Sequence, residues 1–257
     1  MSYTNSKLVS YTAISPNRSS PRNHEIDTIT IHCMAGNCTV EQCGAIFAPP
    51  SRQASSNYGI GSDGRIALYC PESDRSWCTS SASNDNRAVT IEVANDGGAD
   101  TGWHVSDKAF SALIDLVTDI CKRNGIRRLL WKADKSLIGR VGEQNMTVHR
   151  WFAAKSCPGD YLYNLHYRIA AEVNKRLGVI ASAVVYKVQV GVFTFKTNAV
   201  NYSKKVKAAG FDNYLDASSG KYVIYAGVFS KRENATARAA ALAKKGIQSH
   251  IVECMTL

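Results

Sequence analysis

The stretch Thr28-Ile-Thr-Ile-His32 decides how the first part of the chain folds. Its first four residues are all β-branched, which is typical of a strand in a sheet. His32 ends this apolar run, at a point where a side chain can emerge at the edge of a sheet. The pattern therefore predicts a strand that delivers an imidazole to that edge.

The residues that follow predict a central sheet with helices packed on it. Further strands are expected at 57–61, 65–69 and 89–93, and the turn Asp63-Gly64 makes the first two a hairpin. Two helices are expected, at 107–124 with Ser106 as N-cap and at 161–177. We therefore expect an α/β domain over residues 1–178, a mixed sheet with flanking helices.

The last part of the chain repeats itself at an offset of 36 residues. Gly191-Val-Phe193 recurs as Gly227-Val-Phe229, and Tyr186 matches Tyr222. Each copy predicts a strand, a helix and a strand, and neither copy can bury a sheet face alone. We expect the two to pair into one small α+β domain over 184–257, with ferredoxin-like β-α-β-β-α-β order, after a linker at 179–183.

Length and composition fit two folded domains. The chain has 257 residues, of which 45% are hydrophobic and 20% charged. It contains no run of about 18 apolar residues, so no membrane span is expected. The start, Met1 to Arg22, is polar and lacks the apolar centre of a signal peptide. We therefore expect a protein made in the cytoplasm without a signal peptide.

Positive charge is concentrated in the second domain. The chain carries a net charge of +10, and from Val184 onward eleven Lys and Arg face four Asp and Glu, which leaves +7. Such a charge favours an anionic partner, such as nucleic acid, a membrane face or anionic wall polymers. A solvated surface that keeps the domain in solution is the alternative that charge alone leaves open.

Three residues could hold a metal ion. His32 ends a strand, His149 ends the short β-like run Thr147-Val-His149, and Cys157 follows in the loop Ser156-Cys-Pro-Gly159. Two imidazoles and one thiolate are good zinc donors, and three protein ligands leave a fourth position open for catalysis. His32 is far from the other two in sequence, so spacing alone leaves open that these are ordinary structural residues.

Taken in order, these stretches resemble the type-2 N-acetylmuramoyl-L-alanine amidase family, which includes peptidoglycan recognition proteins and phage endolysins. The resemblance covers roughly residues 25–178. It rests on the His32-x-x-x-Gly opening, the Tyr58 hairpin, the Trp77 segment, the Val89–Glu92 strand and the His149…Lys155-x-Cys157-Pro ending. It implies that His32, His149 and Cys157 bind Zn²⁺, and the presence of Cys157 favours an enzyme over a non-catalytic recognition protein.

The resemblance also implies roles for three further residues. Lys155 would stabilise the oxyanion, Tyr58 would orient the water or the intermediate, and Glu92 would take the proton of the water. The alternatives are that Glu92 only bonds a neighbouring group in its strand and that Lys155 is surface charge. Cys38 and Cys43 match a disulfide of animal recognition proteins, with a reduced pair as the alternative.

The repeat resembles the SPOR domain, a ferredoxin-like module that binds septal glycan strands. The match rests on Tyr186-x-Val-Gln-Val-Gly-x-Phe193 and its second copy. It implies that this domain binds the cell wall, and the domain has no recognised nucleic-acid motif. We therefore expect bacterial peptidoglycan, with anionic wall polymers as a further possibility, as the partner, and no nucleic acid. The sequence leaves the oligomeric state open.

The two resemblances together imply a zinc hydrolase that cuts the lactyl–L-alanine amide of peptidoglycan. The expected lack of a signal peptide and the added second domain favour a phage or prophage endolysin. Such an enzyme would be released through a holin pore to lyse the host, and it would therefore be antimicrobial. A bacterial autolysin or a wall-recycling amidase is the first alternative. A non-catalytic peptidoglycan-binding protein is the second, and the intact His, His, Cys set argues against it.

Overall fold

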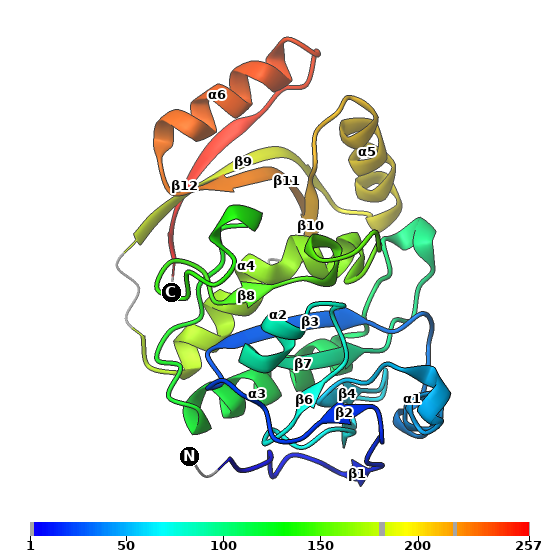
Figure 1. Cartoon of the computed structure of the whole chain (residues 1–257). Helices are drawn as coiled ribbons and strands as arrows, with labels where there is room; N and C mark the ends of the chain where they lie inside the picture. Colours follow the sequence, from blue (N-terminus) through cyan, green and yellow to red (C-terminus); the bar gives the residue numbers. More distant parts are fainter. Residues whose placement is uncertain (1–2, 180–182, 218–219, 257) are drawn as a thin grey trace. The chain divides into compact units, whose positions relative to one another are not determined.

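The computed structural model describes residues 3–179, 183–217 and 220–256. The chain divides into two compact units, Met1–Val179 and Ile180–Leu257. Figure 1 follows both units along the chain. The linker expected at 179–183 falls mainly on residues 180–182, which lie outside the described residues.

A mixed sheet forms the centre of the first unit, with strand order β1-β5-β4-β7-β3-β8. The strands are β1 Tyr11–Thr12, β3 Thr28–Cys33, β4 Tyr58–Ile60, β5 Ile66–Leu68, β7 Ala88–Val93 and β8 Met146–Thr147. β3 lies between β7 and β8 and runs parallel to both, and β4 and β5 form the expected antiparallel hairpin. A separate pair joins β2 Arg18–Ser19 to β6 Arg75–Ser76. The strand that carries His32 therefore has a neighbouring strand on each side.

Helices cover this sheet (Figure 1). They are α1 Val40–Phe47, α2 Ala82–Arg87, α3 Asp107–Arg123 and α4 Gly159–Arg176, with short 3₁₀ turns η1 Pro50–Arg52, η2 Ala99–Thr101, η3 Lys135–Leu137 and η4 His149–Trp151. The expected cap of α3 is present, because the Ser106 side chain accepts a hydrogen bond from the backbone N–H of Ala109. The apolar face of α3 packs with α4 and the sheet in one core.

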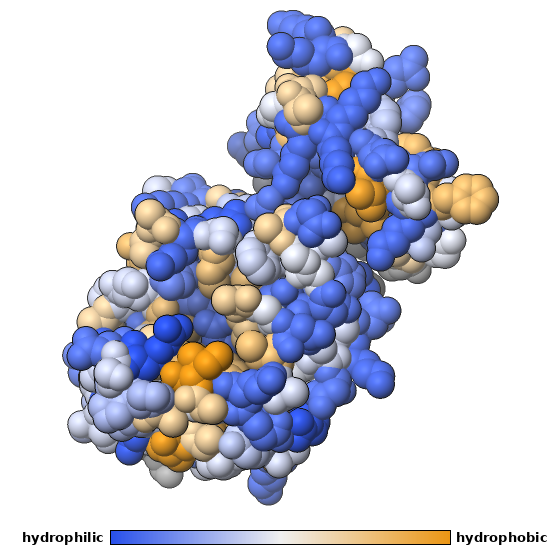
Figure 2. Space-filling model, turned by 90° about the vertical axis from the view of Figure 1, so that its right-hand side faces the viewer, coloured by the Kyte–Doolittle hydropathy of each residue, from blue (hydrophilic) through white to orange (hydrophobic). Residues whose placement is uncertain are grey.

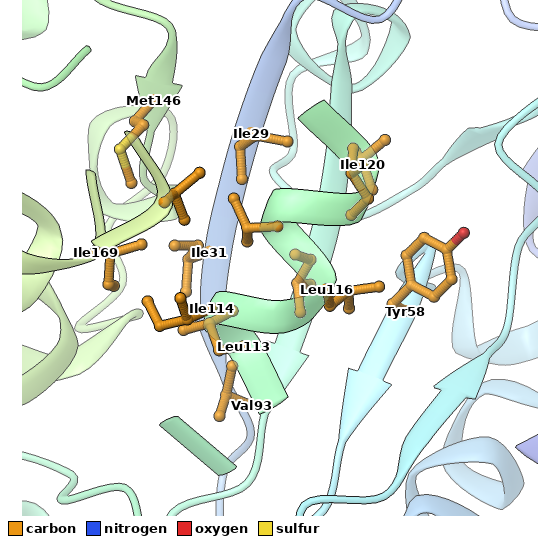
Figure 3. Close-up of a cluster of buried hydrophobic side chains, with 14 of the residues drawn as sticks. Ile29, Ile31, Tyr58, Val93, Leu113, Ile114, Leu116, Ile120, Met146 and Ile169 are labelled. Atoms are coloured by element: carbon orange, nitrogen blue, oxygen red, sulfur yellow. The ribbon is translucent and has the colours of Figure 1, made fainter. Parts of the chain in front are cut away.

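The register of the sheet sorts side chains between its two faces. Ile31, Ile91 and Tyr58 are aligned across β3, β7 and β4, and all are buried in the main core. Figure 3 shows Ile31 and Tyr58 in this core beside α3. The next residue of each strand is aligned in the same way, and these residues are His32, Glu92 and Gly59. Because successive side chains of a strand point to opposite faces, His32 and Glu92 face away from the α3 core.

The second unit has the expected β-α-β-β-α-β order. Its elements are β9 Ala183–Phe193, α5 Lys196–Ala208, β10 Tyr214–Asp216, β11 Tyr222–Phe229, α6 Arg232–Ala243 and β12 His250–Thr256, and its antiparallel sheet has the order β10-β11-β9-β12. Val188 and Ile224 lie in a separate core with Ala199 of α5 and Leu242 of α6. Both helices therefore cover one face of this sheet.

The repeated Gly-Val-Phe motif has a steric reason. A Cβ atom on Gly191 would lie 2.6 Å from the ring of Phe193, and one on Gly227 would lie 2.7 Å from the ring of Phe229. Real Cβ atoms do not approach so closely. Glycine two residues before each Phe therefore leaves space for the ring to fold back over the strand.

The surface of the molecule is predominantly hydrophilic on the face seen in Figure 2, with smaller hydrophobic areas between the polar groups. Within the described ranges, none of the helices combines the length and the apolar character that crossing a bilayer requires.

Candidate metal and catalytic site

The structure brings His32, His149 and Cys157 together. His32 lies near the end of β3, His149 begins η4, and Cys157 lies in the loop before α4. The Sγ of Cys157 is 3.3 Å from Nδ1 of His32, although the two are 125 residues apart. The rings of His32 and His149 are 5.1 Å apart, and the donor atoms of all three residues lie within 4.8 Å of one another.

The chemistry of these donors fits a divalent zinc ion. The Nε2 atoms of His32 and His149 are buried and have no hydrogen-bond partner among the described residues. Burial lowers the pKa of both imidazoles, that of His32 strongly, and the neutral ring is the form that binds a metal. A hydrogen bond with Cys33, followed by burial, raises the pKa of the Cys157 thiol, but a bound cation deprotonates a coordinating thiol.

Glu92 lies beside this cluster. Its Oε1 is 3.8 Å from Nδ1 of His32, its side chain is 17% exposed, and its buried Oε2 has no partner within the described part of the chain. Burial, and then the nearby Cys33, raise the pKa of this carboxyl well above its ordinary value. A carboxyl in such a place can exchange a proton with a water molecule near the histidines.

Cys78 also reaches the cluster, which the sequence did not indicate. Its thiol, His32 and Glu92 place their donor atoms within 4.8 Å of one another. Cys78 follows β6, and it carries no motif or spacing that relates it to His32. The segment after β6 lies beside β7, where the hydroxyls of Ser76 and Thr90 share a hydrogen bond of 2.7 Å, and this long-range contact brings Cys78 near the site.

Lys155 lies on the open side of the site. It is exposed, and its charge contributes to lowering the pKa of His149. No ion pair is recorded for its ammonium group in the part of the chain that the structure describes. Lys155 is therefore a cation near the donor cluster whose charge is available to a ligand.

The structure places Tyr58 away from the donor cluster. Tyr58 is fully buried on the α3 side of the sheet (Figure 3). Its position level with Ile31 and Ile91 puts it on the face opposite to that of His32. Its hydroxyl donates to Oε1 of Glu72 at 2.6 Å and accepts from the backbone N–H of Ser6 at 2.9 Å. Tyr58 therefore belongs to the core, and its hydroxyl does not face the metal donors.

The cysteines are all free, including Cys38 and Cys43, so these two are not joined in this structure. Cys43 is buried in a small core beneath α1, and burial raises the pKa of its thiol above the ordinary value. The reduced alternative for this pair is the one that the structure contains.

A cavity of about 490 Å³ adjoins the donor cluster. Its lining includes His149 and Lys155 of the site, together with Arg52, Arg75, Trp77 and Asp85. The segment around Trp77 was expected from the sequence, whereas Arg52 and Arg75 were not. Nothing in the spacing of these arginines relates them to the histidines.

Comparison with known families agrees with this geometry. The N-acetylmuramoyl-L-alanine amidase family Amidase_2 matches residues 22–160, a range that holds all three metal donors, Glu92 and Lys155. The chain belongs to this amidase family. Residues 182–253 of the amidase match the SPOR domain. The family supports N-acetylmuramoyl-L-alanine amidase activity, and the SPOR domain supports binding to peptidoglycan.

Several solved structures are similar to parts of the amidase. The endolysin amidase LysCS from Clostridium intestinale is 18% identical over 70% of this chain and 100% of its own, with a TM-score of 0.43. An AmpD derivative is 18% identical over 60% of this chain and 89% of its own, with a TM-score of 0.40. The peptidoglycan-binding domain of the Bacillus subtilis lytic enzyme CwlC is 32% identical over 29% of this chain and 95% of its own, with a TM-score of 0.27. No curated protein matches the chain significantly.

Proposed function

We propose that this chain is a zinc-dependent amidase that hydrolyses the amide between the lactyl group of N-acetylmuramic acid and L-alanine in peptidoglycan. The observation that carries the proposal is the convergence of His32, His149 and Cys157, whose donor atoms lie within 4.8 Å of one another. Three protein ligands with nitrogen and sulfur donor atoms are typical of a catalytic zinc site, whose fourth position stays open. When bound, the ion would polarise the scissile carbonyl and make a water molecule more acidic.

Two residues of the chain then carry the proton and the charge. Glu92, 3.8 Å from His32, takes the proton of the attacking water and passes it to the amide nitrogen as the C–N bond breaks. The products are the lactyl carboxylate and the free amine of L-alanine. The exposed ammonium group of Lys155 stabilises the negative charge that develops on the carbonyl oxygen.

We further propose that the chain is a phage or prophage endolysin, whose second unit holds it on the wall. The sheet face opposite the helices supports wall binding. There the rings of Tyr214 and Tyr225 lie 5.3 Å apart, and Nζ of Lys187 is 5.0 Å from the centre of the Tyr225 ring. Flat aromatic rings beside a cation suit a sugar face and an anionic substituent.

Digestion of purified cell walls tests the catalytic proposal. We expect new N-terminal L-alanine, detected by mass spectrometry, and about one zinc ion per chain. Cys157→Ala should lose both zinc and activity, whereas Cys254→Ala, in the second unit, should keep both. New reducing sugar ends in place of alanine termini, or full activity of Cys157→Ala without zinc, would contradict the proposal.

A further inference from the structure

The positive charge of the second unit lies on its helices and not on its sheet. The exposed lysines of α5 are Lys196, Lys204, Lys205 and Lys207, and this helix contains no acidic residue. The four strands together contain one lysine, Lys187, and two acids, Asp216 and Glu253. The fold therefore separates a basic helical layer from a sheet that has no excess of positive charge.

The packing of α5 leaves its charge at the surface. Ala199 and Val206 are buried in the core against the sheet. With 3.6 residues per turn, Lys204 points away from this core. Lys196 and Lys207 are eleven residues apart, about three turns, so they lie in one row along the helix.

The topology adds charges of α6 to the same layer. β10 runs parallel to β9 and β12 parallel to β11, so each helix carries the chain back along the sheet and the two helices are antiparallel. The first residues of one helix thus lie at the same end of the layer as the last residues of the other. We call the exposed cations of this layer the basic helical face, and they are Lys196, Lys204, Lys207, Arg232, Lys244 and Lys245.

Helix stability does not account for this face. A cation near the end of a helix, such as Lys207, is favoured by the helix dipole, whereas one at the start is unfavourable. Lys196 and Arg232 nevertheless begin α5 and α6, at corresponding positions of the 36-residue repeat, and neither helix has a side-chain cap. Among the described residues, no carboxylate pairs with Lys196, Lys204 or Arg232. These charges are better explained by an anionic partner than by folding.

The two faces of the second unit suit different partners. Tyr214 and Tyr225 on the sheet suit a sugar, as proposed above. Cations distributed along two helices suit a polymer that bears a negative charge on each repeat. We infer that the basic helical face binds a phosphodiester polymer of the cell wall, while the sheet face binds the glycan. The inference rests on the proposed function, because it takes the wall as the place where the protein acts.

Matched cell walls test the inference. Walls that carry a phosphodiester polymer are compared with the same walls after hydrofluoric acid has removed the polymer and left the peptidoglycan. The full chain with Cys157→Ala is the parent, so that walls are not digested. Adding Lys196→Gln with Lys204→Gln should raise the Kd for untreated walls about tenfold or more, because contacts between cations and phosphates are lost, and should leave the Kd for extracted walls unchanged.

Two matched variants serve as controls. Lys7→Gln with Lys122→Gln removes the same charge from exposed positions of the first unit and should leave the Kd for both kinds of wall unchanged. Lys196→Arg with Lys204→Arg keeps the charge and should bind as the parent does. Tyr225→Ala, on the sheet face, should weaken binding to extracted walls as well.

The binding measurement is independent of the catalytic proposal, because it involves no hydrolysis. A wild-type chain that cuts no wall would contradict the proposed function and leave this inference standing. An unchanged Kd of the Lys196→Gln, Lys204→Gln chain for untreated walls, or equal losses on untreated and extracted walls, would overturn the inference. So would a loss of affinity confined to DNA fragments or to phosphatidylglycerol vesicles, which would assign the basic helical face to nucleic acid or to a membrane.

Discussion

His32 and Glu92 occupy partner positions on the adjacent parallel strands β3 and β7, and their side chains approach to 3.8 Å. The parallel pairing brings a metal donor and a carboxyl to the same face of the sheet with no contribution from loops. A site built on strands in this way is held more rigidly than one built on loops. This relationship supports the proposed role of Glu92 as the proton carrier of the reaction.

Replacing Glu92 tests that role. Glu92→Gln keeps the shape and removes the titratable group, so zinc content and thermal stability should stay close to wild type. Activity should fall by roughly 10²- to 10⁴-fold, the usual contribution of a general acid–base group. Muropeptide turnover, with zinc measured on the same sample, checks this. The exposed Glu25→Gln is the control, and a loss of zinc from Glu92→Gln would mean that the carboxylate is itself a ligand.

Lys155 should affect the rate of the reaction but neither zinc binding nor folding. Lys155→Ala should keep zinc and fold and lose about 10²-fold in kcat, the scale of one oxyanion stabiliser. Lys155→Arg should recover part of the rate, because it keeps the charge with a different shape. The exposed Lys122→Ala should be neutral. A parallel loss of zinc and rate in Lys155→Ala would assign a structural role to this residue.

Tyr58 should matter for stability and not for chemistry. Tyr58→Phe leaves the backbone N–H of Ser6 without its partner and removes one of the hydrogen bonds to the buried Glu72, which keeps those from Arg123 and Asn124. The free energy of unfolding should therefore fall by about 1–3 kcal/mol. The kcat should not change. Urea unfolding and turnover of the same preparation check both statements, with the exposed Tyr167→Phe as control. A large fall in kcat at unchanged stability would restore a catalytic role for Tyr58.

His166 should make stability depend on pH. It is fully buried against Trp131, and burial lowers the pKa of its ring to about 4 from 6.5. Between those values the unfolded chain binds a proton that the folded chain does not, so stability falls as pH drops from 6.5 to about 4. The loss is at most roughly 3 kcal/mol, and His166→Gln should remove it. Urea unfolding at pH 4.5 and 7 checks this, with the exposed His24→Gln as control; an unchanged pH dependence in His166→Gln would contradict it.

The second unit should bind walls without cutting them. It has its own core, so residues 180–257 should fold alone and sediment with purified walls. Its +7 charge should make binding weaken as salt rises, since screening acts over about 8–10 Å at ordinary ionic strength. Tyr225→Ala should lower binding at every salt concentration, whereas Phe195→Ala, an exposed ring at the start of α5, should not. Retention on DNA but not on walls would show that the partner is nucleic acid.

The secondary structure and both fold classes could be predicted from sequence because they depend on local patterns. Each of these patterns acts on residues close in sequence, as in the β-branched runs, the Asp63-Gly64 turn and the Ser106 cap. The 36-residue repeat indicates that one structural unit occurs twice. The set His32, His149 and Cys157 was implied by the resemblance to the amidase family, which rests on motifs in a fixed order along the sequence.

Tertiary structure decided which side chains meet. Tyr58 and Gly59 are neighbours in sequence, yet the pairing of β4 with β7 puts Gly59 level with Glu92 and sends Tyr58 into the core. Because side chains alternate along a strand, a register different by one residue would have reversed these places. Arg52, Arg75 and Cys78 reach the site from separate segments, and only long-range packing relates them to His149. The sequence determined the chemistry available to this protein, and the register of its sheet determined which groups share the site.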